Sequence, residues 1–174
     1  MKRSIFIFIS LFLMYSCCPK DKQLIKLDLI EAWIPYQEGD KSFYSNENNE
    51  VDSIEINSVN MTFNTKGHMC TREVEHIDVN IKGNLFSYLD VNIEPNMLYF
   101  FLRVNNKSQS YFYYFEEENT IQSDDLSNFY SEIVIGNTNY NDVFVLENDS
   151  VMVYYGKNIG IIGYKVGGEE YIID

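Results

Sequence analysis

Along most of this chain, apolar side chains alternate with polar ones in short runs rich in β-branched and aromatic residues. A period of two places successive side chains on opposite faces of a strand, and these residue types fit a half-buried pleated surface. Short polar breaks separate the runs, which is typical of an antiparallel meander. We therefore expect a single all-β domain that forms a curved sheet, half-barrel, barrel or sandwich. The expected strands are Leu29–Pro35, Lys41–Tyr44, Asp52–Phe63, Glu73–Ile81, Phe86–Ile93, Leu98–Val104, Ser110–Phe115, Tyr130–Ile135, Asp142–Leu146, Val151–Tyr155, Gly160–Val166 and Glu169–Ile173.

The last two expected strands form a hairpin whose register follows from its turn. Gly167 and Gly168 suit a two-residue turn in which both positions need positive φ. That turn places Lys165 opposite Glu170, as opposite charges on one face. The other face then carries an apolar stripe, which a slip of one residue would expose to water. The stripe consists of Ile162, Tyr164, Val166, Tyr171 and Ile173, with Val166 opposite Glu169, Tyr164 opposite Tyr171 and Ile162 opposite Ile173.

Two other expected hairpins are apolar on both faces, so both faces must be covered. One has its turn at Asn148-Asp149, and the other joins the aromatic runs Leu98–Leu102 and Tyr111–Phe115. The cover is a closed barrel or sandwich with a loop or the N-terminal segment over the second face, an apolar ligand on the concave side of an open sheet, or a protein partner. The Asn148-Asp149 turn pairs Leu146 with Val151 and Phe144 with Val153, with Phe144, Leu146, Val151, Val153 and Tyr155 on one face and Val143, Val145, Met152 and Tyr154 on the other.

Residues 1–16 have the layout of a secretory signal peptide, because Lys2 and Arg3 precede an apolar core that is too short to span a bilayer. The core runs into Ser16-Cys17-Cys18, which resembles the lipobox of bacterial lipoproteins. The resemblance implies acylation of Cys17, with Cys18 as the alternative, and permanent attachment to a membrane. An ordinary secretory signal with two incidental cysteines is the other interpretation. We expect the signal over residues 1–16, a lipidated anchor and tether over 17–26, and the β domain over 27–174.

The chain is strongly acidic, with 13 Lys and Arg against 26 Asp and Glu and a formal net charge of −13. Loss of Lys2 and Arg3 with the signal would leave a mature charge of 11 − 26 = −15. Such a surface repels phosphate backbones and anionic headgroups. We therefore expect no nucleic-acid partner and no electrostatic attachment to a membrane. Beyond the anchor region only Cys70 remains, so no disulfide framework is expected.

Few residues suggest catalysis or metal binding. His68, Cys70 and His76 are the only soft-ligand candidates, and they give a weak zinc prediction because no Cys-x-x-Cys pair accompanies them. No serine lies in a Gly-x-Ser-x-Gly context that would single it out as a nucleophile. We therefore expect no cofactor, no metal and no enzymatic activity. One enzymatic alternative stays open, a hydrolase of glycans or peptidoglycan that uses two of the many carboxylates.

Segments at both ends of the expected domain are similar to strand and turn segments of small lipoproteins of Bacteroidota. They are Trp33–Asp40 with Phe43–Asn46 and Asp52–Ile54 near the start, and Tyr140–Val145 with Val153–Ile162 near the end. The resemblance implies an envelope location and a β-rich fold, and it transfers no activity. Both the periplasmic side and the cell surface are compatible with it.

Together these features predict a non-enzymatic binding module that is anchored by lipid to the outer membrane. Its expected partner is an envelope protein or an apolar or glycan ligand. A carrier of lipid or lipoprotein, with an apolar cavity in a half-barrel, is the alternative. The partner surface is expected on the aromatic strands, because exposed apolar patches mark interaction sites. It comprises Tyr99, Phe101, Tyr111, Phe112, Tyr113, Tyr114 and Phe115.

Overall fold

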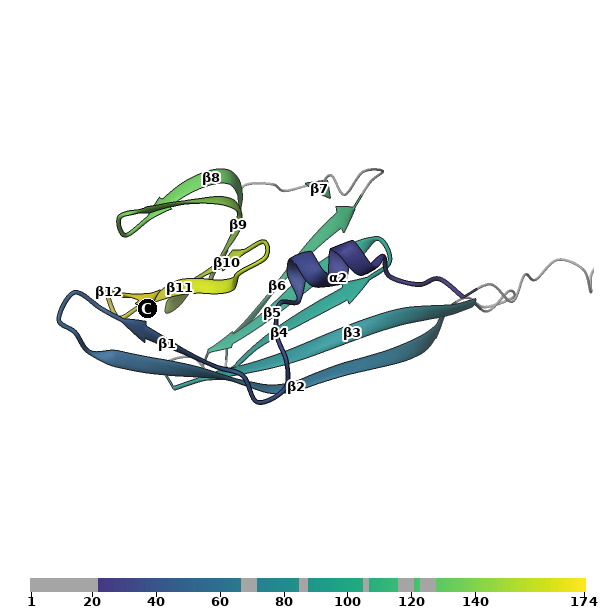
Figure 1. Ribbon diagram of the computed structural model, residues 1–174, viewed down its shortest axis with the longest axis horizontal. Helices are drawn as coiled ribbons and strands as arrows, with labels where there is room; N and C mark the ends of the chain where they lie inside the picture. Colours follow the sequence, from purple (N-terminus) through teal and green to yellow (C-terminus); the bar gives the residue numbers. More distant parts are fainter. Residues whose placement is uncertain (1–21, 67–71, 85–87, 105–106, 116–120, 123–127) are drawn as a thin grey trace, which may run out of the picture.

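The computed structural model describes residues 22–66, 72–84, 88–104, 107–115, 121–122 and 128–174. Within them the chain forms one short helix and twelve strands, connected mostly by tight turns (Figure 1). The elements are α2 (Leu27–Trp33), β1 (Lys41–Ser45), β2 (Val51–Lys66), β3 (Arg72–Gly83), β4 (Tyr88–Glu94), β5 (Met97–Val104), β6 (Lys107–Phe115), β7 (Ile121–Gln122), β8 (Phe129–Ile135), β9 (Thr138–Glu147), β10 (Val151–Gly156), β11 (Gly160–Val166) and β12 (Glu169–Ile173).

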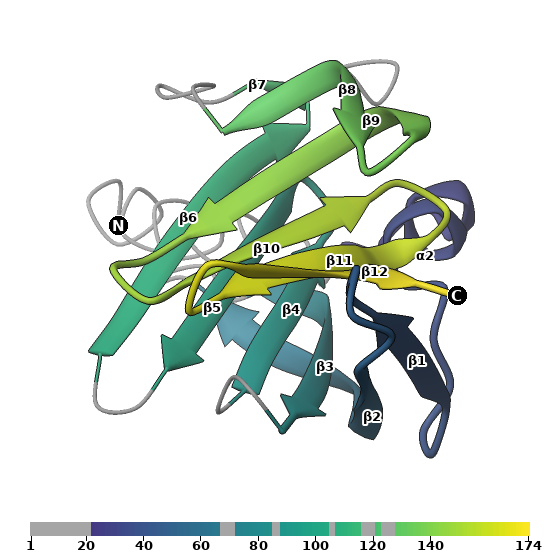
Figure 2. The ribbon, with the colours of Figure 1, turned by 90° about the vertical axis from the view of Figure 1, so that its left-hand side faces the viewer.

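All twelve strands belong to one antiparallel sheet, in the order β7-β6-β5-β4-β3-β2-β1-β12-β11-β10-β9-β8. Neighbours in this order are neighbours in sequence, except where β1 meets β12. There Tyr44 lies opposite Ile173, which joins the two ends of the domain. β7 and β8 lie at the two ends of the sheet, so it stays open while it curls around its own core (Figures 1 and 2). The all-β prediction is confirmed, and of the four shapes the half-barrel is the one observed.

The predicted strand at Leu29–Pro35 is wrong, because residues 27–33 form helix α2 on the concave side of the sheet (Figure 1). Its buried residues are Leu29, Ala32 and Trp33, which are spaced three and four apart and so share one face of a helix. Pro35 favours an extended residue before it, and the helix has ended by Ile34. Seven residues are too few for the apolar pattern to distinguish a helix from a strand. Burial against the sheet favours the helix here.

Aromatic rings fill the centre of the concave side around Phe144. The Phe144 ring centroid lies 4.1 Å from that of Tyr113, 5.1 Å from that of Trp33 and 5.2 Å from that of Phe100. The hydroxyl of Tyr155 donates a hydrogen bond of 2.5 Å to the Trp33 carbonyl, which fixes the end of α2 to β10. A lipid bound here, as the carrier alternative requires, would have to displace these rings.

The β11–β12 hairpin has the predicted turn and register. Gly167 and Gly168 have φ values of +62° and +94°, and Lys165 pairs with Glu170 at 3.1 Å. The stripe is also as expected except at Ile162, which faces the opposite side of the sheet. A β-bulge causes this difference: Tyr154 lies opposite Gly163 and the next residue, Tyr155, lies opposite Ile161. The extra residue in β11 reverses the alternation at Ile162.

In the β9–β10 hairpin the predicted division of faces is confirmed, but the predicted register is wrong. Leu146 lies opposite Val153 and not Val151, because the loop contains four residues instead of two. The Asn148 side chain caps this loop by accepting hydrogen bonds from the backbone of Ser150 and Val151. A shift of two residues preserves which face each side chain occupies. The second face packs in a separate outer cluster of Ile135, Val143, Val145, Tyr154 and Ile162.

Candidate functional site

The sheet divides the seven aromatic residues of the expected partner surface between its two faces. β5 and β6 are antiparallel, with Tyr99 opposite Phe112 and Phe100 opposite Tyr111. Alternation along these strands sends one set of rings into the core and leaves the other on the outer, convex face. Only the outer set is accessible to a partner. The core set is Tyr111, Tyr113 and Phe115, and the outer set is Tyr99, Phe101, Phe112 and Tyr114.

The outer rings form a row across the sheet. Tyr99 and Phe112 stack with centroids 5.6 Å apart and planes inclined by 23°. His76, two strands from Tyr99, stacks with it at 6.4 Å. Phe112 and Tyr114 are 50 % and 49 % exposed, so this part of the outer face offers apolar area to a partner. Exposed aromatic area of this kind is enriched at protein interfaces.

Carboxylates surround the Tyr99 ring on the same face. Asp78 on β3 and Tyr99 on β5 both lie opposite Asn92 of β4, one on each side. Burial together with the nearby charges of Asp78, Glu94 and Asp90 raises the pKa of Tyr99. A cation placed between the ring and these acids would be favoured by both. We call Asp78, Asp90, Glu94, Tyr99 and Phe112 the outer-face site.

In the outer-face site, the surroundings of Asp90 disfavour the charged form of its carboxyl group. Partial burial raises its pKa, as does the charge of Asp78, while a hydrogen bond of 2.6 Å from the Asn80 amide opposes the shift. A carboxyl whose pKa is higher in the folded than in the unfolded state binds more protons when folded. Its contribution to stability is therefore largest below the unfolded pKa and is lost as the pH rises through the folded pKa.

Asp90→Asn is expected to remove this part of the pH dependence while it keeps an amide oxygen for the Asn80 bond. As the pH rises above about 4, the ordinary pKa of an Asp, the free energy of unfolding of the parent chain should fall more steeply than that of the variant. Urea unfolding at several pH values measures both. If the stabilities of the parent chain and the variant change with pH in parallel, the surroundings of Asp90 do not disfavour its charged form.

Of the three weak metal candidates, the structure describes only His76. His68 and Cys70 lie outside the described residues. His76 is mostly buried on β3, where its Nδ1 lies 3.6 Å from Oε1 of Glu94, and the other oxygen of that carboxylate, Oε2, pairs with Lys66. Among the described residues, no group of three or more His, Cys, Asp or Glu side chains is placed to hold a metal ion.

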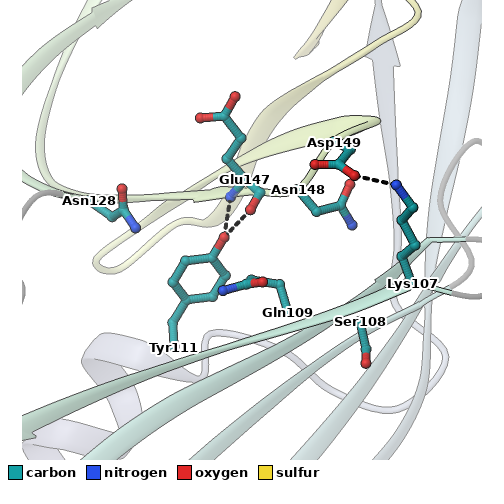
Figure 3. Close-up of a pocket in the computed structure, with 8 residues that line it drawn as sticks. All are labelled: Lys107, Ser108, Gln109, Tyr111, Asn128, Glu147, Asn148 and Asp149. Atoms are coloured by element: carbon teal, nitrogen blue, oxygen red, sulfur yellow. Dashed lines mark hydrogen bonds and ion pairs between the residues drawn. The ribbon is translucent and has the colours of Figure 1, made fainter.

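A polar pocket of about 610 Å³ lies where β6 faces the β9–β10 turn (Figure 3). Contacts among the pocket residues connect β6 to the β9–β10 hairpin, and so connect the two halves of the open sheet. The Tyr111 hydroxyl accepts a 2.6 Å hydrogen bond from the Glu147 backbone N–H and donates to the Glu147 carbonyl, and Lys107 pairs with Asp149. The Lys107 hydrogen bond lowers the pKa of Asp149, the opposite of what a general acid in a hydrolase needs. The pocket is lined by Lys107, Ser108, Gln109, Tyr111, Asn128, Glu147, Asn148 and Asp149.

Tyr111→Phe is expected to destabilise the fold, because it leaves the N–H and C=O of Glu147 without their shared partner. Water can enter the open pocket, so the loss should be about 1–2 kcal/mol in the free energy of unfolding. Urea denaturation measures it, with Tyr114→Phe as the matched control, since Tyr114 is half exposed on the same strand. Equal stability of the two variants would mean that the Tyr111 hydroxyl does not hold the halves together.

The expected lipidation residues, Cys17 and Cys18, lie outside the described part of the chain. Among the residues that the structure describes, no helix is long and apolar enough to cross a membrane. The segment from Lys22, assigned from sequence to the tether, already lies along β3: the Gln23 N–H donates to the Glu73 carbonyl at 2.9 Å, and the Ile25 N–H donates to the buried Glu75 carboxylate at 2.7 Å.

Comparison with protein-family models, with curated proteins and with solved structures gives no match to this chain. The fold and the site therefore define its class. It is an open antiparallel half-barrel with a helix packed on its concave side and an aromatic and acidic outer face.

Sequence reasoning found the outer rings but missed their carboxylate neighbours. Asp78 and Asp90 alternate with buried residues of β3 and β4. This alternation places them on the face opposite the core, so a signal was present in the sequence. Which acids meet which rings depends on the pairing of three strands, and that pairing was not predicted.

Proposed function

We propose that this chain is a lipid-anchored lipoprotein of a bacterial outer membrane that works as a non-enzymatic binding module. The N-terminal layout, with a basic start, a short apolar core and Cys17, supports the anchor. The outer-face site supports the binding role, and the observation that carries it is the stacking of the exposed Phe112 ring on the half-buried Tyr99, which three carboxylates surround.

The partner that fits this site is a protein surface rich in Lys or Arg. Carboxylates attract such cations, and aromatic faces bind them by cation–π contact, most strongly where water is excluded. The net charge of −13 would speed the approach of a basic partner. The apolar area of Phe112 and Tyr114 would then be covered in the complex.

Acylation is tested by labelling growing cells with a palmitate analogue. The parent chain should take up the label, and Cys17→Ser should abolish it. Label retained by Cys17→Ser and lost from Cys18→Ser would move the anchor to Cys18. A chain that is exported and never labelled would contradict the anchoring proposal.

Binding is tested by placing a photo-cross-linking amino acid at Phe112 and, as a control, at Tyr130, which is 41 % exposed on β8. In envelope membranes, the Phe112 position should cross-link to a basic protein and the Tyr130 position should not. The double variant Asp78→Asn and Asp90→Asn, and high salt, should each lower the yield, because both weaken attraction to cations. Equal products at both positions, or a yield that ignores the two acids, would contradict the proposed site.

A further inference from the structure

One end of the molecule combines exposed apolar residues with the start of the described chain. β2 and β3 run on together beyond β4, from the Met61–Ile77 pair to the Lys66–Arg72 pair, and project from the sheet (Figure 1). Met61 and Phe63 point to the concave side of this projection, as Ile77 does. They lie beyond the core and are 59 % and 45 % exposed.

The N-terminal segment is fixed to the same projection. Gln23 forms a parallel bridge with Val74 on the edge of β3 that β4 leaves free. Lys22 pairs with Glu73 at 3.0 Å, and its ammonium group lies 4.7 Å from the centroid of the Phe63 ring. Leu24, next to this bridge, is 59 % exposed. We call residues 22–27, 60–66 and 72–75 the arm.

The charge of the arm differs from that of the rest of the chain. Its Lys and Arg are Lys22, Lys26, Lys66 and Arg72, and its acids are Glu73 and Glu75, so its formal charge is 4 − 2 = +2. The whole chain carries −13. An anionic surface would therefore attract the arm and repel the remainder, which gives the molecule a preferred orientation.

We propose that the arm is a membrane-contact surface that places Met61, Phe63, Leu24 and Leu27 among the headgroups of the bilayer. This inference rests on the proposed anchor: five residues from Cys17 to Lys22 span at most about 17 Å, so the arm stays near the bilayer surface. The exposed apolar side chains gain by leaving water. The net positive charge of the arm favours anionic headgroups, although Lys22 and Lys66 already pair with Glu73 and Glu94. The outer membrane thus faces the arm, while the acidic bulk of the sheet points away.

The test compares Phe63→Trp with Phe43→Trp in the full chain. Phe43 is 54 % exposed on β1, at the other end of the β2 strand, so it is a matched control. Each variant is purified from membranes and reconstituted in vesicles of phosphatidylethanolamine and phosphatidylglycerol, with and without brominated lipid as the quencher. The native Trp33 is 1 % exposed and gives the same background in both variants.

The tryptophan introduced by Phe63→Trp should be quenched about threefold more strongly than that introduced by Phe43→Trp, with emission shifted to the blue. Equal quenching would overturn the proposed surface, and circular dichroism of both variants checks that they fold. Mass spectrometry of the same samples reports acylation separately. If the chain proves unacylated and soluble, it is mixed with excess vesicles, and equal quenching there also overturns the surface.

Discussion

Replacing Phe144 with alanine is expected to lower the free energy of unfolding by about 3–5 kcal/mol, the cost of deleting a large buried ring. Phe144 is fully buried, and its ring contacts those of Trp33, Phe100, Tyr113 and Phe129. The variant would leave a cavity where α2 meets both halves of the sheet. Few neighbours can collapse into it, because each is a rigid ring held by its own strand or helix.

Urea or thermal unfolding followed by near-ultraviolet circular dichroism measures this loss. Phe43→Ala is the matched control, because its ring is 54 % exposed and its removal should change stability by no more than about 0.5 kcal/mol. A similar small effect for both variants would mean that the aromatic centre is not the main source of stability. Binding of an apolar ligand by Phe144→Ala alone would show that the parent chain fills this space with its own rings.

Gly160→Ala is expected to destabilise the fold strongly. Gly160 has a φ of +82°, and a Cβ atom there would overlap the Tyr36 hydroxyl oxygen. That hydroxyl accepts a hydrogen bond of 2.5 Å from the Ile161 N–H, which ties the segment after α2 to β11. The left-handed backbone costs an alanine about 1–2 kcal/mol, and forced displacement of Tyr36 adds about 1–3 kcal/mol.

Gly39→Ala separates these two contributions. Its φ of +87° is nearly the same, but nothing lies within 4 Å of the added Cβ atom. Gly39→Ala should therefore lose only the backbone part, and the difference in free energy of unfolding between the two variants measures the Tyr36 contact. If the two variants lose the same stability, the packing of Tyr36 against Gly160 has no energetic role.

The outer-face site shows how far a single sequence can lead toward function. The rings of β5 and β6 stood out because they are numerous, yet only alternation in the folded strands separates Phe112 and Tyr114 from the buried Tyr113. Once a strand is assigned, its two faces follow from the period of two. The choice of the outer face requires knowledge of which side the core occupies, and that depends on β9, β10 and α2.

Two local errors have the same physical origin. The bulge at Ile162 and the four-residue loop after Glu147 each insert residues that hydrophobic patterning does not register. A shift by two residues in the β9–β10 register leaves every side chain on its predicted face, so hydrophobic patterning cannot reveal the shift. A bulge reverses a face, and it is stabilised by contacts with strands distant in sequence.

The amino-acid sequence by itself determined the all-β class, the faces of most strands and the β11–β12 turn. These depend on alternation over neighbouring residues and on the positive φ of two glycines, which are local properties. Only the tertiary structure decided that Leu27–Trp33 is a helix, that the sheet stays open, and that Asp78 and Asp90 meet Tyr99. Each of these requires burial or pairing between different elements, and such tertiary contacts override the weak preferences of a short segment.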